Sequence, residues 1–206
     1  MLVPDKNTEF GLRGLLARHS DLGMRAIGFD VFIHPERDPG CLLRGHEFLR
    51  QFHRQYSHAL LMFDLEGSGQ ESKSRDQLER EVETRLKQSG WGDRAAAILF
   101  DPELEIWVWA ESGEVDRILG WAGRSPDLRS WLRGSRLVNR HATKPDRPKE
   151  ALEEALRTVR KPRSSAIYLE LAGAVDHRRC ADPAFQKFRS VVSQWFPTSA
   201  TTVADS

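Results

Sequence analysis

The chain has little cysteine, no long apolar stretch and no excess of one charge. Its two cysteines, Cys41 and Cys180, are far apart and outside any metal-ligand spacing, which argues against a disulfide framework or a zinc site and favours a reducing cytoplasm. Nowhere do eighteen apolar residues follow one another, and residues 1–10 lack a signal-peptide core, so we expect neither secretion nor a membrane span. The net charge of +1 provides no global basic field, so any contact with nucleic acid must be local.

Short runs of strand-forming residues alternate with helical patterns. The runs are Met1–Val3, Met24–Ile33, His58–Phe63 and Arg94–Phe100. The segments between them carry apolar residues three or four apart, as one face of a helix requires. Because parallel neighbours need a crossover that is usually a helix, we predict a doubly wound α/β fold with a four-stranded, mainly parallel sheet.

The pattern changes after Phe100, where helices separated by Ser, Gly and Pro replace the alternation. We therefore predict a core of residues 1–111, a helical region of residues 112–197 packed on that core, and a flexible tail of residues 198–206. The helix before Gly90 is bounded most clearly, since Ser74 and Gln77 form a capping box at its start.

Acidic residues follow every predicted strand. They are Asp5 and Glu9 after the first strand, Glu36 and Asp38 after the second, Asp64, Glu66 and Glu71 after the third, and Asp101, Glu103 and Glu105 after the fourth. The carboxyl ends of parallel strands meet at one edge, where ligands usually bind. Crowded carboxylates repel one another unless a cation lies among them, and hard oxygen ligands suit Mg²⁺ or Mn²⁺. We select Asp64, Glu66, Asp5, Glu9, Asp101 and Glu105 as candidate metal ligands.

The sharpest element runs from Asp64 to Gly69, where an apolar strand enters an acid-x-acid pair and a glycine-rich turn. On an extended chain Asp64 and Glu66 would share a face and hold one ion together. The alternative is a solvated turn in which both carboxylates only mark the surface, and the residues favour neither.

Two other loops have competing interpretations. Asp101 before Pro102 is typical of a helix N-cap, as is Asp182 before Pro183, so we favour capping for Asp101 and keep Glu105 as a ligand candidate. His34 and Arg37 could supply a general base and a phosphate-binding cation, although a turn with ordinary surface charges is the favoured reading. We expect the remaining histidines, His177 included, on the surface or on helix faces.

The main basic stretch lies in the helical half and comprises Arg136, Arg140, Lys144, Arg160 and Arg163. It could contact phosphates, together with the free N–H groups of a helix that begins near Ser165. The commoner alternative is a solvated, capped helix start.

Taken in order, five segments resemble a Toprim-like family of bacterial methylation-associated anti-phage defence systems, related to a Toprim-like domain of unknown function. The segments are residues 3–9, 34–41, 64–67, 101–107 and 180–185, and their order matches along nearly the whole chain. The resemblance places Asp64 and Glu66 at the family's acid-x-acid positions, which hold Mg²⁺ for phosphodiester chemistry. It departs at Pro4, where the family has a glutamate after the first strand. Asp5 or Glu9 could substitute for that glutamate, or the catalytic site is degraded.

Two functions follow as expectations. One is a Mg²⁺- or Mn²⁺-dependent nuclease in which Asp64 and Glu66 hold the metal while His34 or Arg37 assists. The other is a catalytically inactive Toprim-like subunit that binds nucleic acid or other defence proteins, alone or as a homodimer. A P-loop or dinucleotide-binding protein is rejected, because neither phosphate-binding motif follows a strand.

Overall fold

The computed structural model describes residues 1–198 except 111, 136, 139–141, 143 and 179. Its centre is an all-parallel sheet in the order β2-β1-β3-β4. The strands are β1 (Leu2–Val3), β2 (Phe32–Ile33), β3 (Ala59–Asp64) and β4 (Ala95–Phe100). The predicted α/β class is therefore confirmed.

Each of the first three strands is followed by a helix, which makes the crossover that a parallel sheet requires. These helices are α1 (Lys6–Ala17), α2 (Arg37–Arg50) and α3 (Arg75–Leu86). Asp5 caps α1 and Ser74 caps α3, each accepting a backbone N–H of the first turn. A turn of π-helix, Lys87–Trp91, extends α3 and contains Gly90 at φ +101°, as expected of a glycine that ends a helix.

The predicted strand over Met24–Ile33 is wrong in length. Only Phe32 and Ile33 pair with the sheet, while Met24 forms an isolated antiparallel bridge with Pro197. The strand is short because β2 lies at the edge of the sheet and pairs only with β1, which consists of Leu2 and Val3. Strand-forming residues without a partner strand remain irregular.

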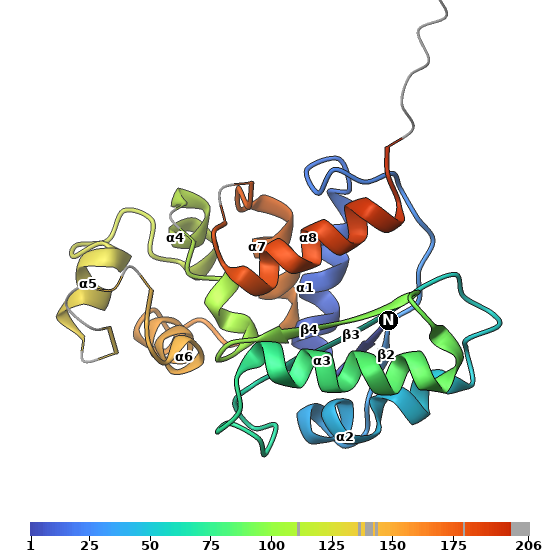
Figure 1. Cartoon of the computed structure of the whole chain (residues 1–206). Helices are drawn as coiled ribbons and strands as arrows, with labels where there is room; N and C mark the ends of the chain where they lie inside the picture. The colour runs from blue at the N-terminus through green and yellow to red at the C-terminus, as the bar shows by residue number, and fades with distance from the viewer. Residues whose placement is uncertain (111, 136, 139–141, 143, 179, 199–206) are drawn as a thin grey trace, which may run out of the picture.

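Helices cover both faces of the sheet, α2 and α3 below it and α1 and α8 above it in Figure 1. The alternation of side chains along β3 explains both layers. Leu60 and Met62 join the core beneath α1 and the C-terminal helices, whereas Leu61 and Phe63 join the core against α2 and α3. Because both faces are buried, the strand reads as a continuous apolar run.

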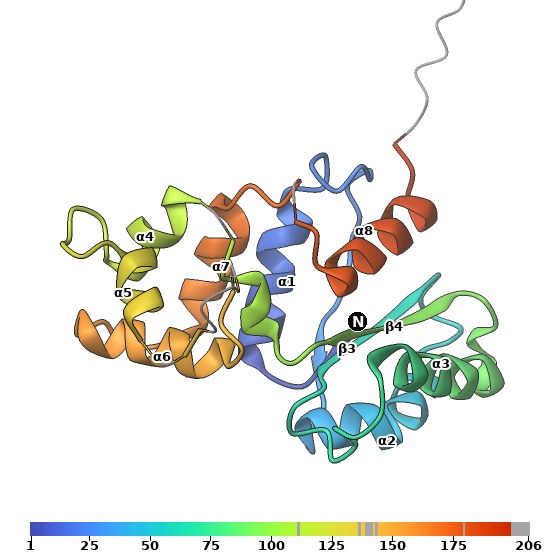
Figure 2. The same ribbon diagram turned by 60° about the vertical axis from the view of Figure 1, so that its left-hand side comes forward.

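In the described residues of the C-terminal half the regular elements are helices, as predicted. Its elements are η2 (Leu104–Trp107), α4 (Gly113–Leu119), α5 (Leu128–Gly134), α6 (Pro148–Thr158), α7 (Ser165–Ala174) and α8 (Pro183–Trp195). Helices α4, α5 and α6 lie together beyond the end of the sheet, and α7 runs beside α1 (Figures 1 and 2). Gly14 permits this approach, since a Cβ there would lie 2.7 Å from Leu169 O. The two predicted parts thus share one hydrophobic core, while residues 199–206 of the predicted tail lie outside the described part.

The outer edge of β4 is closed by side chains of α3. Glu79 Oε1 accepts the backbone N–H of Leu99 at 2.9 Å, and Glu83 Oε1 accepts that of Ala97 at 3.1 Å. Lys187 of α8 bonds both carboxylates. The backbone donors of an edge strand are thereby satisfied within the chain, so they are not free to pair with another strand.

Candidate metal centre at the carboxyl edge of the sheet

Asp64 ends β3 at the carboxyl edge of the sheet and is fixed by two hydrogen bonds. Its Oδ1 accepts the backbone N–H of Leu104 at 2.9 Å, and its own backbone N–H donates to Asp38 Oδ1 at 2.9 Å. The first bond links Asp64 to the chain after β4, and the second links it to the start of α2. Asp64 therefore lies where the loops after three strands meet.

The predicted helix start at Asp101 is wrong. Beyond β3 and β4 the two chains stay paired, with the N–H of Leu65 bonded to Phe100 O and that of Glu66 bonded to Pro102 O. The chain turns only afterwards, so η2 begins at Leu104 with Glu103 in an extended conformation before it. Asp101 is left exposed outside any helix.

The corresponding prediction for Asp182 is confirmed, because it caps α8 by accepting the N–H of Phe185 at 3.0 Å. It also accepts the indole N–H of Trp107 at 2.9 Å. Leu104 and Val108 are buried, and Trp107 packs against the same core.

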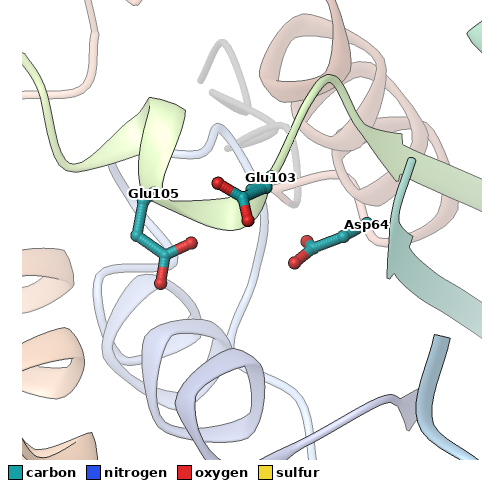
Figure 3. Close-up of side chains that lie close together, drawn as sticks. All are labelled: Asp64, Glu103 and Glu105. Carbon is teal, nitrogen blue, oxygen red and sulfur yellow. The ribbon is translucent and has the colours of Figure 1, made fainter. Parts of the chain in front are cut away.

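Three carboxylates come together at this edge. Asp64, Glu103 and Glu105 each offer an oxygen, and these oxygens all lie within 4.8 Å of one another. Figure 3 shows Glu103 and Glu105 on the same side of η2, near the carboxylate of Asp64 at the end of β3. Glu103 is 6% exposed and Glu105 is 2% exposed, so the cluster is largely shielded from water.

Two cationic side chains border the cluster. Lys149 Nζ lies 3.5 Å from Glu103 Oε1, and its backbone N–H donates to Glu103 Oε2 at 3.3 Å. Arg163 Nη2 donates to Glu105 Oε1 at 2.6 Å, and the same oxygen accepts the hydroxyl of Tyr168 at 2.5 Å. Glu105 thus has a fixed orientation, as a metal ligand requires.

Burial and mutual repulsion oppose ionisation here. Burial, together with the charges of Asp38 and Glu105, raises the pKa of Asp64 well above its ordinary value. Burial likewise raises the pKa of Glu103, although the nearby Lys149 opposes the shift. Burial alone would lower the pKa of Lys149, but Glu103, Glu105 and Asp64 raise it overall, so Lys149 stays cationic. A divalent cation would relieve the repulsion.

The structure brings together only two of the predicted metal ligands, Asp64 and Glu105. Glu66 is exposed and lies in a turn after β3, so the alternation of an extended chain does not carry it into the group. Its charge still contributes to the raised pKa of Glu103, after burial and the charge of Glu105. Asp5 caps α1 through Thr8, and Glu9 pairs with Arg13 at 2.9 Å.

His34 and Arg37, the predicted assisting pair, flank the turn into α2. His34 is 4% exposed, its Nδ1 accepts the backbone N–H of Glu36 at 3.1 Å, and burial lowers its pKa. A Cβ on Gly40 would lie 2.1 Å from that nitrogen, so this glycine is required for the ring to pack there. Arg37 is exposed and has φ +51°. The geometry gives His34 a role in holding the turn.

Some of the predicted phosphate-binding residues are engaged in contacts within the protein, whereas Arg160 is exposed. Lys144 Nζ donates to Ile106 O at 2.8 Å, and Ser165 Oγ donates to Asn7 Oδ1 at 3.0 Å. Arg163 points into the carboxylate cluster and also bonds Glu153 at 2.7 Å. Arg160 is exposed, with φ +58°. Arg136 and Arg140 lie outside the described residues.

Sequence reasoning missed Glu103 as a ligand candidate, Lys149 as the cation beside it and Tyr168 as the donor to Glu105. The i, i+2 spacing of Glu103 and Glu105 was the available signal. The expectation for His177 is wrong, because its side chain is 6% exposed and packs against Phe185 rather than lying at the surface.

These features define a class: an α/β protein with an all-parallel sheet and a buried carboxylate cluster at the carboxyl edge. Comparisons of the chain with protein-family models, with curated proteins and with solved structures found no match. Among the described residues, no helix combines the length and apolar character needed to cross a lipid bilayer.

Proposed function

We propose that this protein is a Mg²⁺- or Mn²⁺-dependent nuclease that acts on phosphodiester bonds as a component of bacterial anti-phage defence. The observation that carries the proposal is the convergence of Asp64, Glu103 and Glu105 within 4.8 Å at the carboxyl edge of a parallel sheet. The Toprim-like resemblance supports it, because it independently assigns metal binding to Asp64.

The donor set fits a hard divalent cation. All three groups are carboxylates, and oxygen ligands of this kind suit Mg²⁺ and Mn²⁺ rather than softer metals. The raised pKa of Asp64, caused by burial and then by Asp38 and Glu105, shows that an added positive charge would be favourable there. Bound at this cluster, the metal would supply Lewis-acid activation of water and stabilisation of phosphoryl charge.

The chain's own residues would prepare the substrate site. Arg163 and Tyr168 hold Glu105 in one orientation, and the Leu104 N–H holds Asp64. The Lys149 side chain is 42% exposed while its ammonium faces Glu103, so it can meet a substrate phosphate at the rim. Arg160, Arg136 and Arg140 remain the proposed outer contacts to nucleic acid.

The test is cleavage of supercoiled plasmid, single-stranded DNA and RNA with Mg²⁺, with Mn²⁺ and with a chelator. We expect metal-dependent cleavage by the wild type and a loss of at least 100-fold with Asp64→Asn. Asp101→Asn is the matched control, because Asp101 belongs to the same edge but is exposed. Equal cleavage by the wild type and Asp64→Asn would contradict the assignment.

A second function, an inactive subunit that binds nucleic acid or partner proteins, is favoured by one observation. Lys149 and Arg163 already pair with two of the carboxylates, so part of the cluster's charge is neutralised without metal. Pro4 also replaces the glutamate that the resemblance leads us to expect. In that case metal would have no effect on stability, while Arg160→Glu would still weaken nucleic-acid binding and reduce its salt dependence.

A further inference from the structure

A small cavity lies behind the carboxylate cluster, between the sheet and the C-terminal helices. Its volume is about 60 Å³. Leu12 and Leu15 of α1, Leu171 of α7 and Phe185 of α8 contribute to its apolar wall, and Tyr168 is also part of the lining. These wall residues come from three helices, and α1 is far from α7 and α8 in sequence, so the cavity exists only in the folded protein.

His177 lines this cavity and is only 6% exposed. Neither of its ring nitrogens has a hydrogen-bond partner among the residues that the structure describes. A buried polar group without a partner costs on the order of 1–3 kcal/mol, so such groups usually have a bound partner or a function. Burial, followed by the charge of Arg18, lowers the pKa of His177, which favours the neutral ring with one donor and one acceptor.

Water is a poor occupant, because a buried water needs about two to four polar partners. The other polar side chains in the wall are largely engaged: Tyr168 donates to Glu105 and accepts from Arg163, and Thr8 donates to Asp5 at 3.0 Å. Cys180 adds only a weakly polar thiol. The cavity is therefore apolar apart from one histidine.

We propose that this cavity binds a small neutral molecule with an apolar body and one hydrogen-bonding group, which pairs with His177. The size excludes an aromatic ring and other molecules of that volume, since benzene is held by a cavity of about 150 Å³. A charged ligand would lose its hydration without gaining a counter-charge in the wall. An alcohol of one or two carbons fits both limits.

The test uses methanol and ethanol as probes, titrated into protein with ¹⁵N-labelled histidine and followed by NMR of the ring nitrogens. We expect saturable shifts at His177 and none at His58, which lies away from the cavity against Trp195. His177→Leu should weaken ethanol binding by about 10-fold. His177→Gln keeps a hydrogen-bonding group and should retain most of the affinity.

Xenon, a purely apolar probe, should bind the wild type and His177→Leu equally, which shows that the cavity persists in the variant. The proposal is overturned if His177 shows no saturable shift in the wild type, or if ethanol binds the wild type and His177→Leu equally. If His177→Leu does not fold, the wild-type titration alone tests the proposal. Asp64→Asn should bind ethanol unchanged, so this result is independent of the proposed nuclease function.

Discussion

The carboxylate of Asp38, in the first turn of α2, accepts the backbone N–H of Asp64 at 2.9 Å. This bond joins the loops after β2 and β3 across the end of β1, which lies between those strands. It also brings a second negative charge close to Asp64, which, after burial, is the largest cause of the raised Asp64 pKa. The fold therefore stabilises the loop geometry while it crowds carboxylates.

Asp64→Asn should stabilise the metal-free protein. The amide removes a buried charge that Asp38 and Glu105 repel, while its Oδ1 can still accept the Leu104 N–H. We expect about 1 kcal/mol of stabilisation, or a melting midpoint higher by about 2–4 °C. Thermal unfolding in chelator measures it, with Asp101→Asn as a neutral control. A lower midpoint for Asp64→Asn would show that the cluster is not under electrostatic strain.

Tyr168→Phe should destabilise the protein by about 1.5–3 kcal/mol, because the Tyr168 hydroxyl donates to the buried Glu105 carboxylate. Denaturant unfolding gives the value. The chain's other tyrosine is the control: Tyr56 donates to Asp30 at 2.6 Å in an exposed pair, so Tyr56→Phe should cost less than about 1 kcal/mol. Equal costs for the two variants would mean that Glu105 does not depend on Tyr168.

Glu79→Ala should destabilise the protein by about 2–3 kcal/mol, since it removes a buried acceptor from the Leu99 N–H and a partner from Lys187. The same substitution should accelerate hydrogen exchange at the backbone N–H of Leu99. Glu81→Ala on the same helix is the control, because the partners of Glu81 are the surface side chains of Lys73, Gln77 and Arg85. Unchanged exchange at Leu99 would contradict the role given to Glu79 in closing the edge of β4.

Much of this architecture could be predicted from local patterns. The apolar runs over β3 and β4 and the N-cap at Ser74 depend on neighbours in sequence, and the structure bears them out, although the Gln77 side chain bonds Glu81 instead of completing a capping box. The length of β2 depends on its partner strand, so the residues from Met24 onward could not indicate it. Local sequence likewise could not show that the N–H of Glu66 would pair with Pro102 and displace the helix start from Asp101.

The candidate site was predictable in part for the same reason. Asp64 follows directly from its place at the end of a buried strand. Arg163 and Tyr168 reach Glu105 from α7 and the segment just before it, some sixty residues away in the chain, and only tertiary packing brings them there. His177 is buried by α8 and its neighbours, although its sequence surroundings are charged.

Stability should fall as the pH drops below about 6.5, the ordinary pKa of histidine, because burial lowers the pKa of His177 in the folded protein. At such pH values His177 binds a proton in the unfolded chain but not in the folded chain, so acidification favours unfolding. Arg18 and Arg189 reinforce the shift, while Asp21 and Asp176 oppose it. Unfolding of the wild type and His177→Leu between pH 5 and 8 tests this, and the variant should lose less stability on acidification. Parallel pH profiles would contradict it.

The most direct test of the metal centre is calorimetric titration of Mn²⁺ and Mg²⁺ into the wild type, Asp64→Asn, Glu103→Gln and Glu66→Gln. The three-carboxylate cluster predicts one saturable site in the wild type, lost or weakened at least 10-fold in Asp64→Asn and Glu103→Gln and little changed in Glu66→Gln. No binding to the wild type, or binding that depends on Glu66 but not on Glu103, would contradict a metal centre at this cluster.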